Sequence, residues 1–169
     1  MKTKYNISAF IFIGILGSLS HFFYDWSGSN RIIGYFFATS ESTWEHLKLL
    51  FFPTVIYSVF EYFFVKREVK NYIPSVIISV IVGMFTIVAL FYTYQGILGY
   101  NIDFLNILIY FLGLFAMLVV KNKIINSEYF LSTKSSILFL AVGIIIAFLF
   151  FRFTYNVPTL GIFTPPINV

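Results

Sequence analysis

The stretch EHLKLLFFPTVIYSVFEYFFV, residues 45–65, is apolar over most of its length and is long enough to cross a lipid bilayer as a helix. A spanning helix needs about 20 mostly apolar residues, because the hydrocarbon core of a bilayer is about 30 Å thick. Four further segments meet this requirement, at about residues 6–24, 72–94, 103–120 and 135–153. The sequence therefore predicts an all-α fold, a polytopic transmembrane helix bundle with five spans.

The composition of the whole chain supports a membrane protein. Hydrophobic residues make up 59% and charged residues 11% of the 169 residues, whereas soluble domains have about 45–50% and about 25%. No linker or low-complexity segment divides the chain, so residues 1–169 are predicted to form a single multi-pass domain in the cell membrane. We expect the lipid bilayer as a partner and no nucleic acid, because the net charge of +4 mostly reflects membrane topology.

The distribution of lysine and arginine orients the predicted bundle, because positive charges near helix ends are retained in the cytoplasm. Eight such residues fall on one side, namely Lys2, Lys4, Lys66, Arg67, Lys70, Lys121, Lys123 and Lys134, and three on the other, namely Arg31, Lys48 and Arg152. The N-terminus is therefore predicted in the cytoplasm and the C-terminus outside. The outer tail, residues 154–169, is apolar enough to fold back over the helix ends. The first segment has features of a signal peptide, but its length favours an uncleaved span.

Ionisable residues gather where the first and second predicted spans meet the outer side. On the first span, Gly14, Ser18, His21 and Asp25 are spaced by four, three and four residues, which places them on one helix face. The connection that follows brings Glu41, Glu45 and His46 to the start of the second span. Both histidines of the chain belong to this group.

A structural interpretation explains part of this group. Ser42 and Glu45 fit the S/T-x-x-E capping box, in which both side chains satisfy free amides at a helix start. Charges at an outer interface can also be solvated. This interpretation leaves the convergence of His21, Asp25 and His46 without a cause, and ionisable groups inside a membrane indicate a functional site.

The functional interpretation is an outward-facing binding or catalytic pocket. Two imidazoles with carboxylates suit a divalent metal such as zinc or manganese, and His21, Asp25 and His46 are the predicted ligands. The predicted catalytic residues are Glu45 or Glu41 as a base, together with His46; without a metal the same groups could act as an acid and a base. Arg31 or Lys48 would clamp a phosphate or carboxylate of the substrate. The spacing is not an H-E-x-x-H signature, so it does not specify the metal.

Two further acidic residues have open interpretations. Glu61 lies toward the opposite end of the second span, where it could pair with Lys66 or Arg67, or act as an ion-coupling carboxylate. Asp103 begins the fourth predicted span, where it is either a residue favoured at a helix start or a residue that faces the outer polar group.

Three stretches, SHFFYDWSG, ATSESTWEHLKLLFFP and FTYNVPTLGIFTPP, together resemble a family of small bacterial integral membrane proteins of unknown function. The resemblance covers most of the chain. It implies a multi-helix membrane fold and no established activity.

The sequence leaves three functions open. The first is a membrane-embedded, metal-assisted hydrolase or transferase that acts on a lipid or lipid-linked substrate. The second is a small transporter or substrate-capture subunit for a cation or an anionic solute, which the shortage of polar residues in the last three predicted spans disfavours. The third is a structural or regulatory membrane partner without a small ligand.

Overall fold

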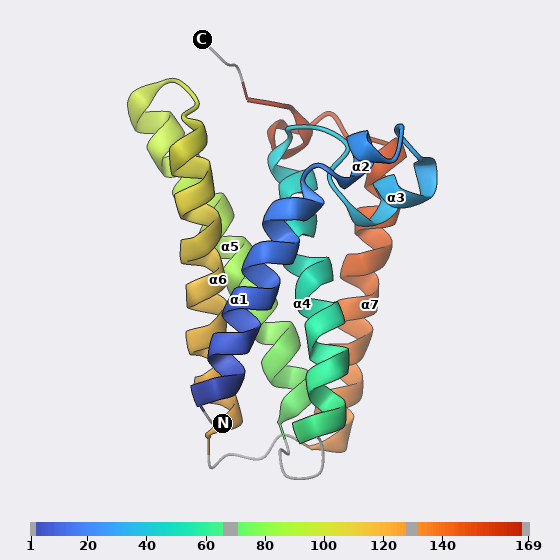
Figure 1. Cartoon of the computed structure of the whole chain (residues 1–169), viewed down its shortest axis with the longest axis vertical. Coiled ribbons are helices and arrows are strands. Elements are labelled where there is room, and N and C mark those ends of the chain that lie inside the picture. Colours follow the sequence, from blue (N-terminus) through green and yellow to red (C-terminus); the bar gives the residue numbers. More distant parts are fainter. Residues whose placement is uncertain (1–2, 66–70, 128–131, 167–169) are drawn as a thin grey trace.

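A computed structural model describes residues 3–65, 71–127 and 132–166 of the chain. Lys2, Lys66, Arg67 and Lys70, which contribute to the predicted orientation, lie outside these ranges. All regular structure within them is helical. The long helices run side by side, and the short helices gather at one end, which we call the site end (Figure 1).

The long helices are α1 (Thr3–Ser20), α4 (Thr43–Val65), α5 (Tyr72–Leu98), α6 (Asp103–Ile125) and α7 (Thr133–Tyr155), and the short ones are α2 (Phe23–Trp26), α3 (Arg31–Phe36) and the 3-10 helix η1 (Gly161–Phe163). Within the described residues, four helices are long and apolar enough to cross a membrane: α4 over Thr43–Phe64, and all of α5, α6 and α7. A shorter apolar stretch, Asn6–Ser20, lies in α1. The prediction of an all-helical, multi-pass membrane bundle is confirmed.

Helix α1 ends earlier than the sequence predicts. The chain turns after Ser20, whose hydroxyl donates a hydrogen bond of 2.8 Å to the carbonyl of Gly17, and the short helix α2 then begins at Phe23. Phe23 and Trp26 pack together, with ring centroids 5.9 Å apart. Asp25 therefore lies on α2 and does not continue the helix face that carries Ser18.

The tail packs against the site end. Phe163 of η1 is buried, with its ring centroid 4.9 Å from that of Trp44 on α4 and 5.4 Å from that of Phe153 on α7. Helix α7 includes Thr154 and Tyr155, which the sequence analysis places in the tail. The tail thus covers the turns of α4 and α7 at the site end.

The centre of the bundle is an apolar layer formed by Ile13, Leu50, Val80, Leu114 and Met117, each at most 1% exposed. These residues come from α1, α4, α5 and α6. The layer separates polar groups at the site end from polar groups at the opposite end. On α4 the two ends are marked by Glu45 and Glu61, which are about 24 Å apart at about 1.5 Å per residue.

A buried ion pair lies at the opposite end. Glu61 of α4 accepts a hydrogen bond from the ammonium group of Lys121 on α6, and one of 2.7 Å from the hydroxyl of Tyr72 on α5. Lys121 is 2% exposed, and its nitrogen also lies 5.6 Å from the centroids of the Tyr57 and Tyr72 rings. Lys121 is thus part of α6, whereas the sequence predicts a span that ends at about residue 120.

Gly17 allows α1, α4 and α6 to approach closely. A Cβ at this position would overlap the hydroxyl of Tyr110 and would lie 2.5 Å from the carbonyl oxygen of Leu49. The Tyr110 hydroxyl bridges two helices, because it donates toward the carbonyls of Ile13 at 2.9 Å and Leu49 at 3.3 Å.

We expect Gly17→Ala to lower the free energy of unfolding by about 1–3 kcal/mol, as overpacking does elsewhere. Reversible unfolding in mixed detergent micelles measures the change. Gly96→Ala on α5 is the control, because a Cβ there meets nothing within 4 Å, and it should be neutral or stabilising. A Gly17→Ala protein as stable as Gly96→Ala would contradict this packing argument.

Candidate functional site

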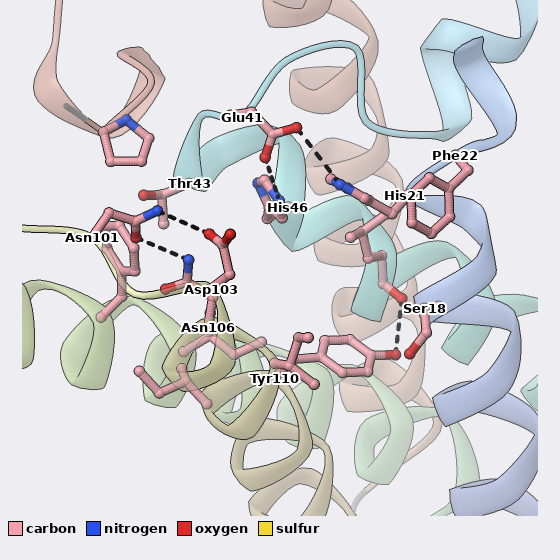
Figure 2. A pocket seen from close by; sticks show the side chains of 17 residues that line it. Ser18, His21, Phe22, Glu41, Thr43, His46, Asn101, Asp103, Asn106 and Tyr110 are labelled. Atoms are coloured by element: carbon pink, nitrogen blue, oxygen red, sulfur yellow. Dashed lines mark hydrogen bonds and ion pairs between the residues drawn. The ribbon is translucent and has the colours of Figure 1, made fainter. Parts of the chain in front are cut away.

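Three predicted site residues meet at the site end, where α1 ends and α4 begins. The Nε2 atom of His21 lies 3.6 Å from one carboxylate oxygen of Glu41, and the Nε2 atom of His46 lies 3.4 Å from the other. The two imidazole rings are 5.2 Å apart between centroids. One potential ligand atom from each residue can be chosen so that all three lie within 4.8 Å of one another. We call these three residues the His/Glu cluster (Figure 2).

The main chain fixes the orientation of His46. Its Nδ1 atom lies 2.9 Å from the carbonyl oxygen of Ser42, one helical turn earlier. A carbonyl only accepts hydrogen bonds, so Nδ1 is the donor, and in the neutral ring Nε2 then carries the lone pair on the side of Glu41. Histidines that bind metals are commonly oriented by such a bond from their second nitrogen.

A cavity of about 620 Å³ opens beside the His/Glu cluster. Its walls come from α1, α4, α5 and α6, and Pro166 of the tail borders it. The apolar part of the lining includes Phe22, Leu49, Ile87, Phe91, Ile107 and Ile109, and the polar part includes Ser18, Thr43, Asn101, Asp103, Asn106 and Tyr110. The His/Glu cluster therefore borders a space large enough for a small organic group.

The wall opposite the His/Glu cluster is polar (Figure 2). The hydroxyl of Tyr94 lies 2.8 Å from the side-chain oxygen of Asn101 and 2.5 Å from that of Asn106. The amide nitrogen of Asn106 donates to Asn101 at 2.9 Å, and that of Asn101 donates to Asp103 at 3.4 Å. Asp103 thus faces the same cavity as the cluster. This agrees with the second of the two interpretations of Asp103, in which it faces the polar group that contains the histidines.

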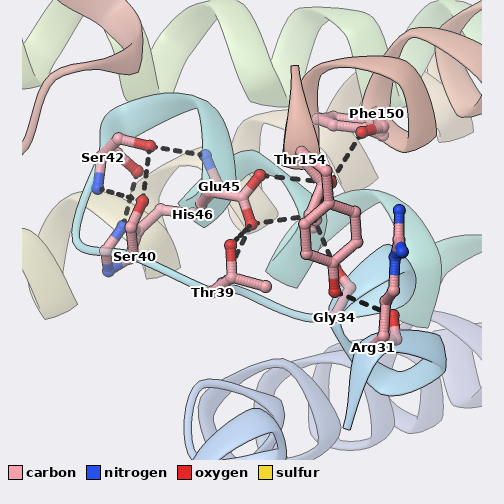
Figure 3. Close-up of polar contacts among 11 residues, drawn as sticks. Arg31, Gly34, Thr39, Ser40, Ser42, Glu45, His46, Phe150 and Thr154 are labelled. Carbon is pink, nitrogen blue, oxygen red and sulfur yellow. Dashed lines mark hydrogen bonds and ion pairs between the residues drawn. The ribbon is translucent and has the colours of Figure 1, made fainter. Parts of the chain in front are cut away.

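Glu45 and Lys48 form a buried ion pair on the far side of the α4 start from the cavity. The ammonium group of Lys48 donates to Glu45 at 2.7 Å, to the carbonyl of Gly34 at 2.9 Å and to the hydroxyl of Thr154 at 2.6 Å. Glu45 also accepts from the amide and the hydroxyl of Thr39 at 2.9 and 3.0 Å. Figure 3 shows Glu45 between Thr39 and Thr154, so the pair joins α4 to α7 and to the loop before Glu41.

The predicted capping box is half formed. The hydroxyl of Ser42 accepts a hydrogen bond of 3.3 Å from the amide of Glu45. The carboxylate of Glu45 does not return to Ser42, because it is committed to Lys48 and Thr39. Glu45 is therefore more than a helix cap, since its burial depends on a partner charge.

Four predicted site residues do not line the cavity: Asp25, Arg31, Glu45 and Lys48. Asp25 is exposed on α2, because α1 stops before it. The guanidinium of Arg31 lies 5.0 Å from the centre of the Tyr155 ring. Lys48 is fully buried beside Glu45.

The opposite wall was predicted only in part, since Asp103 was one of two open interpretations and Asn106 and Tyr110 were not predicted as site residues. Asp103, Asn106 and Tyr110 are spaced by three and four residues, so they share one face of α6. That spacing was available in the sequence and could have identified them. The participation of Tyr94 and Asn101 depends on the tight turn between α5 and α6, where Gly99 adopts a φ of 80°.

The whole chain, residues 1–169, matches the model of a protein family described as "Family of unknown function (DUF6512)". The chain belongs to this family. No curated protein and no solved structure matches the chain. The predicted resemblance to an uncharacterised family is confirmed, and the chemistry of this DUF6512 member has to be argued from its own residues.

The donor set fits a divalent metal ion. Two imidazole nitrogens and a carboxylate oxygen are ligands that zinc and manganese take in proteins, and three protein ligands leave a position for water or substrate. Glu41 is exposed and lies in a loop, so its carboxylate has room to adjust. Among the residues that the structure describes, no lysine or arginine lines the cavity, so a bound metal would be the main positive partner for an anionic substrate group.

Proposed function

We propose that this protein is a membrane-embedded hydrolase or transferase that uses a divalent metal, zinc or manganese, to act on a lipid or lipid-linked substrate at the cell membrane. His21, Glu41 and His46 would hold the metal. The observation that carries the proposal is the His/Glu cluster on the wall of a cavity large enough for a polar headgroup. The chemistry supplied by a bound metal is Lewis acidity and an activated water.

The residues of the site would have separate roles in positioning and in proton transfer. The bond from His46 to Ser42 orients the imidazole, and the Thr39–Glu45 contacts hold the loop that carries Glu41. Glu45 itself is committed to Lys48, so a positioning role fits it better than that of a base acting on substrate. Glu41 has a second oxygen that can accept a proton when the first binds a metal.

The cavity lining supports an amphiphilic substrate. Phe22 and Ile107 line the cavity and are 47% and 58% exposed. The apolar lining therefore continues onto the surface of the bundle, which lipid would cover. A substrate with its apolar chain against these residues would place its polar end between the His/Glu cluster and Asp103.

Capture of a cation is the second candidate function. Glu41 and Asp103 give the cavity two carboxylates, and the basic residues on its described lining are the histidines His21 and His46. The five residues of the apolar layer have no charged or hydroxyl side chain, which disfavours transport of an ion across the membrane. Metal binding is expected for both candidates, and only the enzyme is expected to turn over a lipid.

Metal analysis is the first test. Detergent-purified wild type, dialysed without chelator, should contain near-stoichiometric metal by elemental mass spectrometry, and His21→Ala/His46→Ala should contain none. The content should fall at acidic pH, because histidine ligands bind metal only when deprotonated. Asp25→Ala is the matched control and should keep its metal, since Asp25 lies outside the cluster. A metal-free wild type, or a double variant that keeps its metal, would contradict the proposed site.

Turnover is the second measurement. The metal-loaded protein, incubated with a total membrane lipid extract, should convert a lipid into a product detectable by mass spectrometry. His46→Ala should reduce this conversion to background. Metal binding without any conversion would favour cation capture.

A further inference from the structure

The cavity is lined by two carboxylates, and only one of them has a charged or chargeable partner on the lining. Its ionisable lining consists of His21, Glu41, His46, Asp103 and Tyr110. Glu41 lies within reach of both histidines, so its charge belongs to the His/Glu cluster. The charge of Asp103 has no such partner on the lining.

Asp103 is placed to contact a ligand. It lies in the first turn of α6, and Figure 2 shows its side chain pointing into the cavity, toward the wall that carries Glu41 and His46. Its hydrogen bond from Asn101 is long, at 3.4 Å, and it forms no ion pair with any residue that the structure describes. Asp103 is exposed, and an ionised carboxylate accepts about four hydrogen bonds, so its oxygens are open to a ligand that enters the cavity.

The neighbours of Asp103 restrict what it can bind. The side-chain oxygens of Asn101 and Asn106 both face the hydroxyl of Tyr94, and Asn106 donates back to Asn101. These contacts hold the wall in a defined arrangement. Asp103 then presents a negative, acceptor-only group, which matches a primary ammonium with its three donors.

We infer that Asp103 binds the ammonium group of a zwitterionic amphiphile whose phosphate or carboxylate faces the metal at the His/Glu cluster. The inference rests on the proposed function, because the metal supplies the partner for the anionic group. It names the substrate class: a lipid whose headgroup carries one anionic group and one primary amine. Asp103 is then a specificity-determining residue on the wall opposite the metal.

Lipid binding tests this inference. Native mass spectrometry of the zinc-loaded protein in detergent measures the affinity for phosphatidylethanolamine and for phosphatidylglycerol with the same acyl chains. The wild type should prefer the ethanolamine lipid, and Asp103→Asn should reduce the ratio of the two affinities by about tenfold, as expected for loss of a charged hydrogen-bond partner. Asp25→Asn, exposed at the same end of the bundle and outside the cavity, should leave the ratio unchanged.

The outcomes separate this inference from the proposed function. The inference is overturned if zinc-loaded wild type does not prefer phosphatidylethanolamine, or if Asp103→Asn keeps the wild-type preference. Neither result contradicts the metal site. Loss of zinc in Asp103→Asn also overturns the inference, because Asp103 would then be a ligand. Glycerophosphoethanolamine, which lacks acyl chains, should bind far more weakly than the lipid, and equal binding would overturn the assignment of an amphiphile. A wild type that binds no metal contradicts the proposed function itself.

Discussion

Lys48→Met is expected to lower the free energy of unfolding by about 3–5 kcal/mol, the cost of leaving a buried charge without its partner. Lys48 is fully buried, and the Glu45 side chain beside it is 5% exposed. The substitution removes all three hydrogen bonds that the ammonium group donates, to Glu45, Gly34 and Thr154. Reversible unfolding in mixed detergent micelles measures the loss.

The double variant Glu45→Gln/Lys48→Met is expected to recover much of this loss, because removal of both charges leaves no unpaired charge at this position. The glutamine oxygen can still accept from Thr39. A Lys48→Met protein as stable as wild type would contradict the importance of the pair.

The single substitution Lys48→Met should also weaken metal binding. The Glu45 carboxylate holds Thr39, two residues before Glu41, and Lys48 holds that carboxylate. Loss of a group that orients metal ligands typically reduces affinity by about 10–100-fold. Zinc titration of folded Lys48→Met protein measures this reduction, and unchanged affinity would show that the Glu41 loop is held by other contacts.

Lys121→Met is expected to cost a similar amount, about 3–5 kcal/mol, for the same physical reason. It leaves Glu61 buried, with the Tyr72 hydroxyl as its remaining donor. The double variant Glu61→Gln/Lys121→Met should again recover much of the loss. The measurement is the same unfolding equilibrium in mixed micelles.

A comparison of Lys48→Met with Lys121→Met separates a local effect on the metal site from an effect of lower global stability. Both are buried in ion pairs, but the apolar layer lies between Lys121 and the His/Glu cluster. Lys121→Met protein that remains folded should therefore bind zinc with wild-type affinity, unlike Lys48→Met. Equal losses of zinc affinity in both variants would show that the site depends on global stability and not on the Glu45 network.

The fold could be predicted to a large extent from the sequence. Segment lengths and apolarity locate α4, α5, α6 and α7, because a bilayer requires about 20 apolar residues per helix. Their ends were less predictable. Hydropathy treats Lys121 as a residue outside the membrane, whereas its partner Glu61, distant in the sequence, keeps it inside α6. A pattern along the chain does not show a pair that forms between helices.

The candidate site could be predicted in part. His21, Glu41 and His46 were all among the predicted residues, and the structure brings them together. The helical spacing also included Asp25, because it assumed that α1 continues past Ser20. The charge of Lys48 suggested a ligand for anions, yet the side chain turns inward to Glu45. These differences come from a helix end and from side-chain directions, which depend on tertiary packing.

The apolar layer of Ile13, Leu50, Val80, Leu114 and Met117 has an electrical consequence. A voltage across a membrane acts on a charge in proportion to the part of the field that the charge crosses. Most of that field falls across the apolar centre of the bundle, since aqueous regions screen it. A metal ion or an ammonium group that enters the cavity crosses none of this layer, so its binding is expected to be the same in an energised and a depolarised membrane.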